Sequence, residues 1–548
     1  MVPAERFILT SFYPMQIDNH SVFELLKALL PPPPPARRAA GFAGFGKRFA
    51  SSPWLSSLRS FSQVIFINHP LSGALLLLAF LLVSPWMALL AGVGMAAANL
   101  TSRLLGLAST LRDQGIHGFN GVLVGCAGAS LLHTSALNRV GLVLILVALG
   151  GSLTTLMLEL WSGCFHRRGD PPVLTLPFCL ATWCLLILVS PPSPDPIESV
   201  QISAAGGTLQ ALLLGLPHSF GQVFLCSGLA SGVLVLLAVV IASPMAAALG
   251  ASGAMVGMVT ALTLSQGADQ AAVAQGLWGY NGLLVAIALG GIFHAPGVKS
   301  LLMALAGAGL ATLLQAVQLS LISNLPPLTL SFVLTTWLLQ RLASKGVPAL
   351  IPVSLHAVVT PEEHRKRFLV ARELLGRFRC NLRQRIAGTA QAAGLVPLSP
   401  SLQKRAQHLF QLLDCDCDGS LSLDELREAL LPSRSSNGAS DQSQSSLDSQ
   451  LKATMAAMDF DGDGRIDSAE FSQLIQRLQR LREGEERLLL YLLPVDANGD
   501  DRLDRDEMAR LLKSLGQPPL TATEQSLVFA DQKQGLRWRD FVDRLLLI

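Results

Sequence analysis

Oxygen-bearing side chains recur at a fixed spacing in two twelve-residue segments, residues 414–425 and 459–470. They occupy positions 1, 3, 5, 9 and 12, and a glycine (Gly419 or Gly464) stands at position 6, where the chain must turn sharply. Ca²⁺ binds about six to eight oxygens, and a backbone carbonyl at position 7 completes each set. The predicted ligands are Asp414, Asp416, Asp418, Ser420, Ser422 and Glu425 in the first segment, and Asp459, Asp461, Asp463, Arg465, Asp467 and Glu470 in the second. Two calcium sites are therefore expected.

A third segment, residues 496–507, keeps the ligand spacing but has Asp501 in place of the glycine. A left-handed backbone is less favourable for aspartate than for glycine, so we expect weaker calcium binding there. Its predicted ligands are Asp496, Asn498, Asp500, Arg502, Asp504 and Glu507. Residues 531–541 lie where a fourth loop belongs but lack the ligand set, which predicts a structural partner for the third loop.

These loops resemble those of the EF-hand family. Apolar helix-like runs flank the first two loops, and the apolar residues at position 8, Leu421 and Ile466, suit a short strand that pairs them. The resemblance implies a helical calcium-binding domain over residues 401–548.

Three further motifs occur twice in the same order in the apolar part of the chain. Residues 59–73 have a weaker copy at residues 219–232, residues 115–125 match residues 276–286, and residues 174–183 match residues 328–337. The offset between copies stays close to 160 residues. Two long hydrophobic copies are typical of transporters rather than of short-repeat proteins.

Composition divides the chain into a basic membrane part and an acidic soluble part. Half of the residues are hydrophobic, 14% are charged and the mean hydropathy is +0.46, which argues against a wholly soluble protein. Residues 401–548 carry 18 Lys and Arg against 26 Asp and Glu, whereas the rest of the chain carries 23 against 12. The eight cysteines form no disulfide framework, so reduced thiols are expected.

The apolar part predicts five crossings in each copy. Apolar segments are expected near residues 73–91, 93–110, 118–135, 139–160, 173–190, 228–249, 251–265, 276–294, 298–322 and 328–342. Several are short for a full span, which fits broken or re-entrant helices. Basic residues near the ends of the copies and a connector without Lys or Arg require an odd number of crossings, so the copies are expected to be inverted.

The expected path between the copies is nearly free of charge. Glu159 and Asp269 are the nearest candidates for intramembrane carboxylates, and both fall at segment ends. A cation carrier normally places an ionisable group within the membrane. Amide, hydroxyl and aromatic groups recur instead, which suits a small, flat, uncharged solute.

The motifs SQVIFINHPLSG, GFNGVLVG and LTLPF, duplicated in order, resemble those of the urea transporter family over residues 50–345. The resemblance implies three associated subunits, each with a narrow slot through which urea passes passively. It also implies half-helices that begin at the Gln-Val motif and a central threonine from each copy. The implied polar positions are Gln63, Gln222, Thr175 and Thr329, and the implied wall positions are Val64, Phe66, Val223, Leu225, Phe119, Leu123, Tyr280 and Leu284.

This chain departs from the motifs in copy two, which has Leu225 where copy one has Phe66, and Ser331 where copy one has Pro177. The first change is expected to relax the grip on a flat solute. The second is expected to alter how the last helix is broken.

Simpler interpretations remain open for the same residues. The alternative for the glutamines is a hydrogen bond between helices, and the alternative for the threonines is a bond to their own helix backbone; the matched placement in the two copies favours the slot. Asn120 and Asn281 are interpreted mainly as braces for turns beside glycines. Trp183 and Trp337 are interpreted as anchors at the membrane interface.

Residues 361–386 form a basic amphipathic segment that allows two interpretations. One is a helix lying on anionic lipid beside the membrane, and the other is an intramolecular target for the acidic domain that follows.

The sequence thus predicts an all-α polytopic membrane protein with a soluble EF-hand domain. The expected domains are 1–60, a cytoplasmic region with a Pro-rich linker; 61–190, repeat one; 191–218, a connector; 219–345, repeat two; 346–400, a basic linker helix; and 401–548, the EF-hand domain.

The expected function is passive urea transport by a homotrimer in the inner or plasma membrane, with both termini cytoplasmic and with calcium as a possible regulator. Alternatives are a channel for short amides or ammonia, or a membrane-anchored calcium sensor. The sequence contains no nucleophile–base pair, phosphate loop or catalytic metal set, so an enzyme is not predicted, and nucleic acid is not an expected partner.

Overall fold

The structure is a computed structural model that describes residues 53–132, 137–164, 172–189, 207–267, 269–322, 324–346, 360–387, 400–425, 452, 455, 463–472, 474–475, 502–529, 535–537 and 541. The predictions for the Pro-rich region, for most of the connector, and for Asp459, Asp461, Asp496, Asn498 and Asp500 lie outside these residues. The chain divides into two compact units between Lys366 and Arg367.

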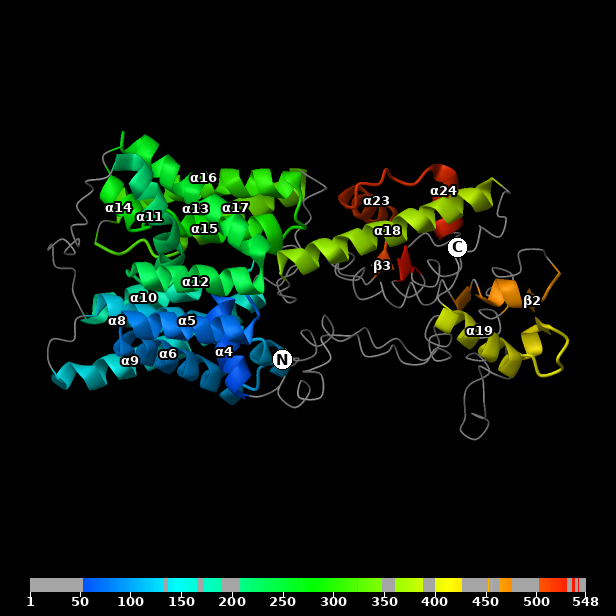
Figure 1. The fold of residues 1–548 in the computed structure, drawn as a ribbon, viewed down its shortest axis with the longest axis horizontal. Coiled ribbons are helices and arrows are strands. Elements are labelled where there is room, and N and C mark those ends of the chain that lie inside the picture. Colours follow the sequence, from blue (N-terminus) through cyan, green and yellow to red (C-terminus); the bar gives the residue numbers. More distant parts are fainter. Residues whose placement is uncertain are drawn as a thin grey trace. The chain divides into compact units, whose positions relative to one another are not determined.

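The first unit consists of helices that follow the same order twice (Figure 1). Copy one contains α4 (Pro53–Gln63), α5 (Pro70–Val83), α6 (Pro85–Leu104), α7 (Ser109–Asp113), α8 (Phe119–Leu131), α9 (Leu137–Cys164) and α10 (Leu176–Val189). Copy two contains α11 (Gly207–Gln222), α12 (Leu229–Ala242), α13 (Pro244–Leu264), α14 (Gln270–Ala274), α15 (Tyr280–Ile287), the π-helix η1 (Ala288–Ile292), α16 (Val298–Leu321) and α17 (Leu330–Gly346). The two copies pack together where α5 contacts α12.

A serine–proline pair sets the corner after the second helix of each copy. Ser84 ends α5 and caps α6, where its Oγ accepts a hydrogen bond from Met87 N at 3.0 Å. Ser243 does the same between α12 and α13. Proline fits the first position of a helix, where no N–H bond is lost. The expected boundaries near residues 92 and 250 were therefore wrong, because the serine–proline signal precedes them.

The Gln-Val motif ends a helix in each copy. Gln63 is the last residue of α4 and Gln222 the last of α11, so the implied half-helices that begin at the motif were wrong in direction. Three residues further on, Phe66 and Leu225 both have a φ of 57°, a left-handed conformation that is unfavourable for large side chains. The same strained turn thus closes the motif in both copies.

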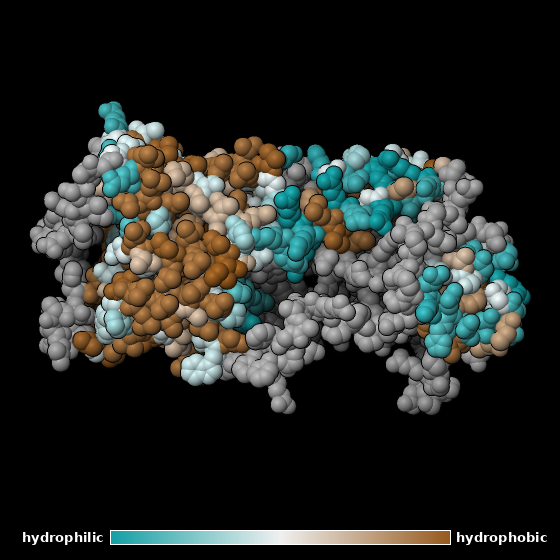
Figure 2. Space-filling view, in the orientation of Figure 1, coloured by the Kyte–Doolittle hydropathy of each residue, from teal (hydrophilic) through white to brown (hydrophobic). Residues whose placement is uncertain are grey.

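Four helices among the described residues are long and apolar enough to cross a membrane: Pro85–Leu104, Val140–Ser162, Pro244–Leu264 and Val298–Leu321. The shorter apolar helices are Pro70–Val83, Phe119–Leu131, Leu176–Val189, Leu229–Ala242 and Tyr280–Ile292. Figure 2 shows hydrophobic side chains spread over the presented face of this unit. Such a surface suits lipid rather than water.

Glycines allow the helices of each copy to approach closely. A Cβ on Gly94 of α6 would lie 2.2 Å from the carbonyl oxygen of Gly121 in α8. A Cβ on Gly253 of α13 would lie 2.3 Å from the carbonyl oxygen of Gly282 in α15. Small residues at helix contacts are a common means of packing in membranes.

The second unit contains most of α18 (Pro361–Ile386), together with α19 (Pro400–Leu413), β1 (Ser420–Leu421), β2 (Ile466–Asp467), β3 (Arg502–Leu503), α23 (Arg505–Ser514), α24 (Ala522–Phe529) and β4 (Leu536–Arg537). β1 pairs antiparallel with β2, which places Leu421 opposite Ile466 and confirms the pairing expected at position 8. β3 pairs with β4, placing Leu503 opposite Leu536. The incomplete fourth loop is therefore the structural partner of the third, as predicted.

Candidate functional site

The two threonines of the LTLPF-like motifs meet in the interior of the first unit. Thr175 Oγ1 lies 2.7 Å from Thr329 Oγ1, and both residues are buried. Each threonine directly precedes a helix, because its carbonyl accepts the first backbone bond of α10 or α17. Two helix N-termini therefore approach the same point, where their partial positive charges favour an electron-rich oxygen. The Cys179 thiol lies 3.4 Å from Thr329 Oγ1, a neighbour that the sequence did not predict.

A strained turn places each threonine. Leu174 has a φ of 56° and Leu328 a φ of 48°. The Asn120 side chain donates to the carbonyl of Leu174 at 3.3 Å, and the Asn281 side chain donates to that of Leu328 at 3.2 Å. The two asparagines therefore act as the braces that the sequence favoured.

Copy two reinforces its brace. The Tyr280 hydroxyl donates to the Leu328 carbonyl at 2.6 Å, and Phe119 occupies the matching position in copy one without a hydroxyl. Asn281 also donates to Gln315 Oε1 at 2.8 Å, and Gln315 in turn donates to the Leu277 carbonyl. A carbonyl held by two donors is fixed more firmly than a carbonyl held by one.

The glutamines of the two copies differ in burial. Gln63 is buried and donates to the Gln114 carbonyl at 2.8 Å, an arrangement that ties two segments of copy one together. Gln222 is half-buried at the end of α11. A solute contact for either side chain stays a prediction.

Most of the predicted wall residues lie in one hydrophobic cluster with the threonine turns. Val64, Leu123, Val223, Leu284 and Tyr280 are buried, and Phe119 and Leu225 are half-buried. The Phe66 ring packs edge-on against Phe293 and Phe332 of copy two, with ring centroids 6.0 and 6.1 Å apart. In the opposite direction, the Leu225 carbonyl accepts a hydrogen bond from Ser130 of copy one at 3.4 Å. Each Gln-Val motif thus packs against the other copy.

Two tryptophans join the copies reciprocally. Trp183 Nε1 donates to the Pro326 carbonyl at 3.0 Å, and Trp337 Nε1 donates to the Pro172 carbonyl at 2.7 Å. Both side chains are half-buried against the core. They therefore bind the opposite copy, whereas the sequence indicated anchors at the membrane interface.

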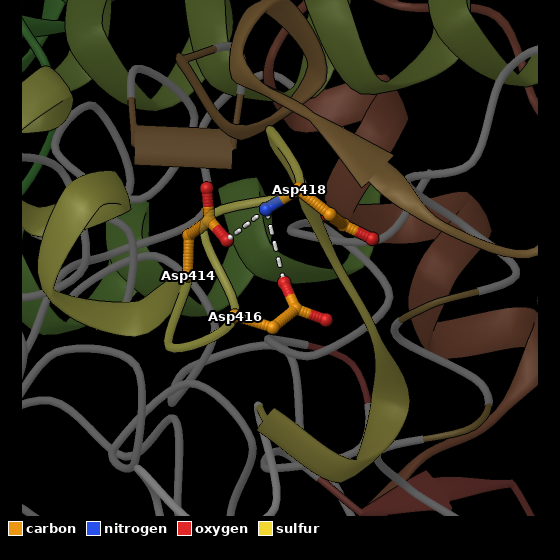
Figure 3. Close-up of side chains that lie close together, drawn as sticks. All are labelled: Asp414, Asp416 and Asp418. Atoms are coloured by element: carbon orange, nitrogen blue, oxygen red, sulfur yellow. Dashed lines mark hydrogen bonds between the residues drawn. The ribbon is translucent and has the colours of Figure 1, made fainter.

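Carboxylates converge in the first EF-hand-like loop (Figure 3). Asp414 Oδ1 and Asp416 Oδ1 both accept from the backbone N–H of Asp418, at 3.1 and 3.0 Å. One carboxylate oxygen from each of these three residues lies within 4.8 Å of the others. Such a group of hard oxygen donors fits Ca²⁺. Gly419 has a φ of 83°, which agrees with the sharp turn expected at position 6.

The glutamate at position 12 is bonded in the same way in all three loops. Glu425 accepts from the Ser422 backbone, Glu470 from the Asp467 backbone and Glu507 from the Asp504 backbone. The bond from the Ser422 backbone N–H is the leading cause that lowers the pKa of Glu425. A carboxylate kept ionised in this way is ready to bind a cation. The metal-binding roles of the second and third loops stay predictions.

Within the second unit, one face of α18 is buried. Ala371, Leu375, Phe378 and Leu382 follow a helical stripe with at most 3% of their surface exposed. Phe378 packs edge-on against Phe541 at 6.0 Å between ring centroids.

An ion pair lies beside this stripe. Arg379 Nη2 is 3.1 Å from Glu524 Oε2, with both side chains almost fully buried, and Arg383 Nε lies 2.8 Å from Glu524 Oε1. Burial acts to raise the pKa of Glu524, but hydrogen bonds from Arg383, the Thr521 backbone and Arg379 outweigh it and lower that pKa. The carboxylate is therefore held in its charged form.

Comparisons with known proteins agree with both parts of the chain. The urea transporter family matches residues 55–344, and the EF-hand domain pair matches residues 403–476. Urea transporter 1 of the goat, Capra hircus, is 31% identical over 322 residues, which cover 57% of this chain and 82% of that protein. Urea transporter 1 of the rat, Rattus norvegicus, is 32% identical with the same coverage.

Proposed function

Because the chain belongs to the urea transporter family, we propose that it conducts urea passively across a membrane through one narrow slot per chain. It is a multi-pass membrane protein of a family of non-enzymatic channels, in line with its apolar helices. The observation that carries the proposal is the meeting of Thr175 and Thr329 at two helix N-termini. Urea presents one acceptor oxygen and several N–H donors, and desolvating them without replacement costs several kcal/mol.

Urea thus needs donors for its oxygen and acceptors for its N–H groups, and residues at and near the two threonines supply both. The helix N-termini and hydroxyl groups offer partial positive charge to the urea oxygen. The carbonyl of Leu174, which accepts one side-chain hydrogen bond from Asn120, offers an acceptor to its N–H groups. The side-chain oxygens of Gln63 and Gln222 are proposed to offer further acceptors along the slot. Apolar walls that include Phe66 offer a hydrated ion nothing in exchange for its water, which is expected to exclude ions. The threonine hydroxyls are bonded to each other, so a solute that passes between them must replace that bond.

Stopped-flow swelling of proteoliposomes tests this function. Vesicles with the full chain are expected to take up urea faster than protein-free vesicles, with little flux of methylammonium. Acetamide provides the comparison for a second solute of related chemistry. Urea permeability equal to that of protein-free vesicles would contradict the proposal, and a faster acetamide flux would assign the slot to other small amides.

The membrane arrangement belongs to the same proposal. The repeated order of helices and the matched turns at Phe66 and Leu225 support two copies of one unit. The charge bias of the sequence supports inverted copies with both chain ends in the cytoplasm of a plasma or inner membrane. Family membership supports a homotrimer. Crosslinking in native membranes is expected to give trimers.

We also propose that the second unit binds calcium at the loops 414–425 and 459–470, and more weakly at the loop 496–507. The carboxylate group of Asp414, Asp416 and Asp418 supports the first site. Bound Ca²⁺ neutralises repulsion among such carboxylates and orders the loop. Calorimetric titration is expected to resolve two tight sites, and Glu425→Gln to abolish one of them.

Calcium is proposed to act on transport through α18. Its first turn contacts copy two of the transport unit, where the Glu362 carboxylate accepts from Ser243 Oγ at 2.6 Å and from Met245 N at 2.7 Å. His364 Nδ1 lies 2.9 Å from the Gly291 carbonyl in η1. The next residue after η1, Phe293, contacts the proposed slot residue Phe66. The ion pair of Arg379 and Glu524 supports the proposed contact of the EF-hand domain with the same helix.

Urea flux at low and high calcium on the tail side tests this regulation. The full chain is expected to change its permeability with calcium, whereas a chain truncated near residue 360 is expected to be insensitive. Equal fluxes in all four conditions would leave the tail as a calcium buffer.

A further inference from the structure

We propose that Trp183 and Trp337 are positioning residues that set the separation of Thr175 and Thr329, and thereby the size of solute that passes. This inference rests on the proposed urea transport. It adds two residues that lie outside the proposed polar and wall positions of the slot. It is carried by the pair of hydrogen bonds that cross between the copies.

The two bonds occupy equivalent places in the two copies. Trp183 stands eight residues after Thr175, and Trp337 stands eight residues after Thr329. The acceptors, Pro172 and Pro326, each stand three residues before the threonine of their own copy. Each tryptophan therefore holds the approach to the other copy's threonine.

A loop that contains proline depends on such a donor. Proline has no N–H and a fixed φ, so the segment has few ways to satisfy its carbonyls from within. The two bonds are partly buried, and a carbonyl shielded from water without a partner is costly, so an indole N–H from a neighbouring helix is an effective anchor. The strained turns at Leu174 and Leu328 follow within two residues and are held in turn by Asn120 and Asn281.

Each threonine is thus fixed from two directions. Asparagine holds the turn from within its own copy, and tryptophan holds the approaching loop from the opposite copy. Loss of one tryptophan bond frees one loop, so the distance between the two hydroxyls is no longer set by both copies. A wider and more variable separation is expected to weaken the fit to urea and to admit bulkier amides.

Replacement of the indole by phenylalanine tests the inference in full-length protein in proteoliposomes. For W183F and W337F we expect urea permeability to fall about three- to tenfold, the range that corresponds to one net hydrogen bond. The ratio of methylurea to urea permeability is expected to rise in both variants and most in the double variant. A merely structural loss would lower both solutes together and leave the ratio unchanged.

W86F is the matched control. Trp86 lies in the first turn of α6 in the same unit, and its Nε1 is buried without a hydrogen-bond partner among the described residues. Its replacement is expected to leave the permeability ratio at the wild-type value. Where a phenylalanine variant fails to fold, benzothienylalanine at residue 183 or 337 keeps the shape of the ring and removes only the N–H donor.

The outcomes separate this inference from the proposed function. Absence of urea transport in vesicles that contain the wild-type protein would contradict the proposed transport function. The positioning role alone would be contradicted if the wild-type protein transports urea but the ratio of methylurea to urea permeability stays unchanged. This outcome would have to hold in folded W183F, W337F and benzothienylalanine proteins.

Discussion

The two copies of the transport unit have the same order of helices but differ in the hydrogen bonds that hold the turns before Thr175 and Thr329. Among the described residues, the turn carbonyl of Leu174 in copy one accepts from the Asn120 side chain, whereas that of Leu328 in copy two accepts from both Tyr280 and Asn281. Copy two also contains the π-helix η1 and accepts the first turn of α18. π-Helical turns often mark functional positions. The proposed effect of calcium would therefore reach the transport unit through copy two.

Removal of the threonine hydroxyls tests whether Thr175 of copy one and Thr329 of copy two contribute equally to the passage of urea. We expect T175V and T329V each to lower urea permeability roughly five- to hundredfold, because an unmet hydrogen bond costs about 1–3 kcal/mol. Stopped-flow swelling measures the change. T182V and T336V are the controls, since these threonines are buried in α10 and α17 without hydrogen-bond partners among the described residues. A normal flux in folded T175V and T329V would remove the threonines from the path.

Replacing Phe66 by leucine makes copy one resemble copy two at this position. F66L loses two edge-on ring contacts, each worth about 0.5–1.5 kcal/mol beyond burial, so the thermal unfolding midpoint is expected to fall. Selectivity for flat urea over acetamide should fall as well. L225F, the reverse change in copy two, is expected to leave that selectivity equal or higher. An unchanged selectivity in F66L would assign the ring to packing alone.

A pair of serines isolates the contact of copy two with α18. Ser84 caps a helix, whereas Ser243 caps the matching helix and also donates to Glu362. S84A and S243A are both expected to lose about 0.5–2 kcal/mol of stability as caps. Only S243A should also reduce the effect of calcium on urea flux. Equal calcium responses in the two variants would contradict a regulatory role for this contact.

Y280F leaves the Leu328 carbonyl of copy two with one side-chain donor, as the Leu174 carbonyl has in copy one. The Leu328 carbonyl keeps its bond from Asn281, so the expected loss of stability is about 0.5–1.5 kcal/mol, seen as a lower unfolding midpoint. F119Y, the reverse change, is expected to give no loss of stability if the Leu174 carbonyl accepts the new hydroxyl. A stable Y280F would show that the second donor contributes nothing.

Acid is expected to loosen the second unit before it affects the proposed slot. The pKa of Glu524 is lowered in the folded protein, so its contribution to stability is present above the unfolded value of about 4.3 and is lost as the pH falls through the lower folded value. Hydrogen exchange of α24 should accelerate in that range. E524Q removes this dependence, and E373Q, at an exposed glutamate of α18, retains it.

The sequence predicted those features that repeat or that depend on local spacing. The duplicated motifs led to Thr175 and Thr329, which the structure brings together, and the ligand spacing led to the carboxylate group at Asp414. The pairing of the third loop with an incomplete fourth also followed from spacing. In such patterns the residue spacing within a short segment determines the local conformation of the chain.

Contacts between distant segments were not predictable in this way. Nothing near Trp183 indicates that its N–H meets Pro326, because the partner lies in the other copy. The place of Cys179 beside Thr329 was missed for the same reason. The direction of the helix at Gln63 was missed because an apolar run alone does not reveal on which side of a polar motif the helix lies.

The corners at Ser84 and Ser243 have a mechanical consequence. A single residue ends one helix and starts the next, so no flexible loop separates the two helices at each corner. Each pair of helices is therefore expected to move as a stiff body. A thermal change in the distance between the hydroxyls of Thr175 and Thr329 is then expected to come from the backbone of residues 172–175 and 324–329, which lead into α10 and α17.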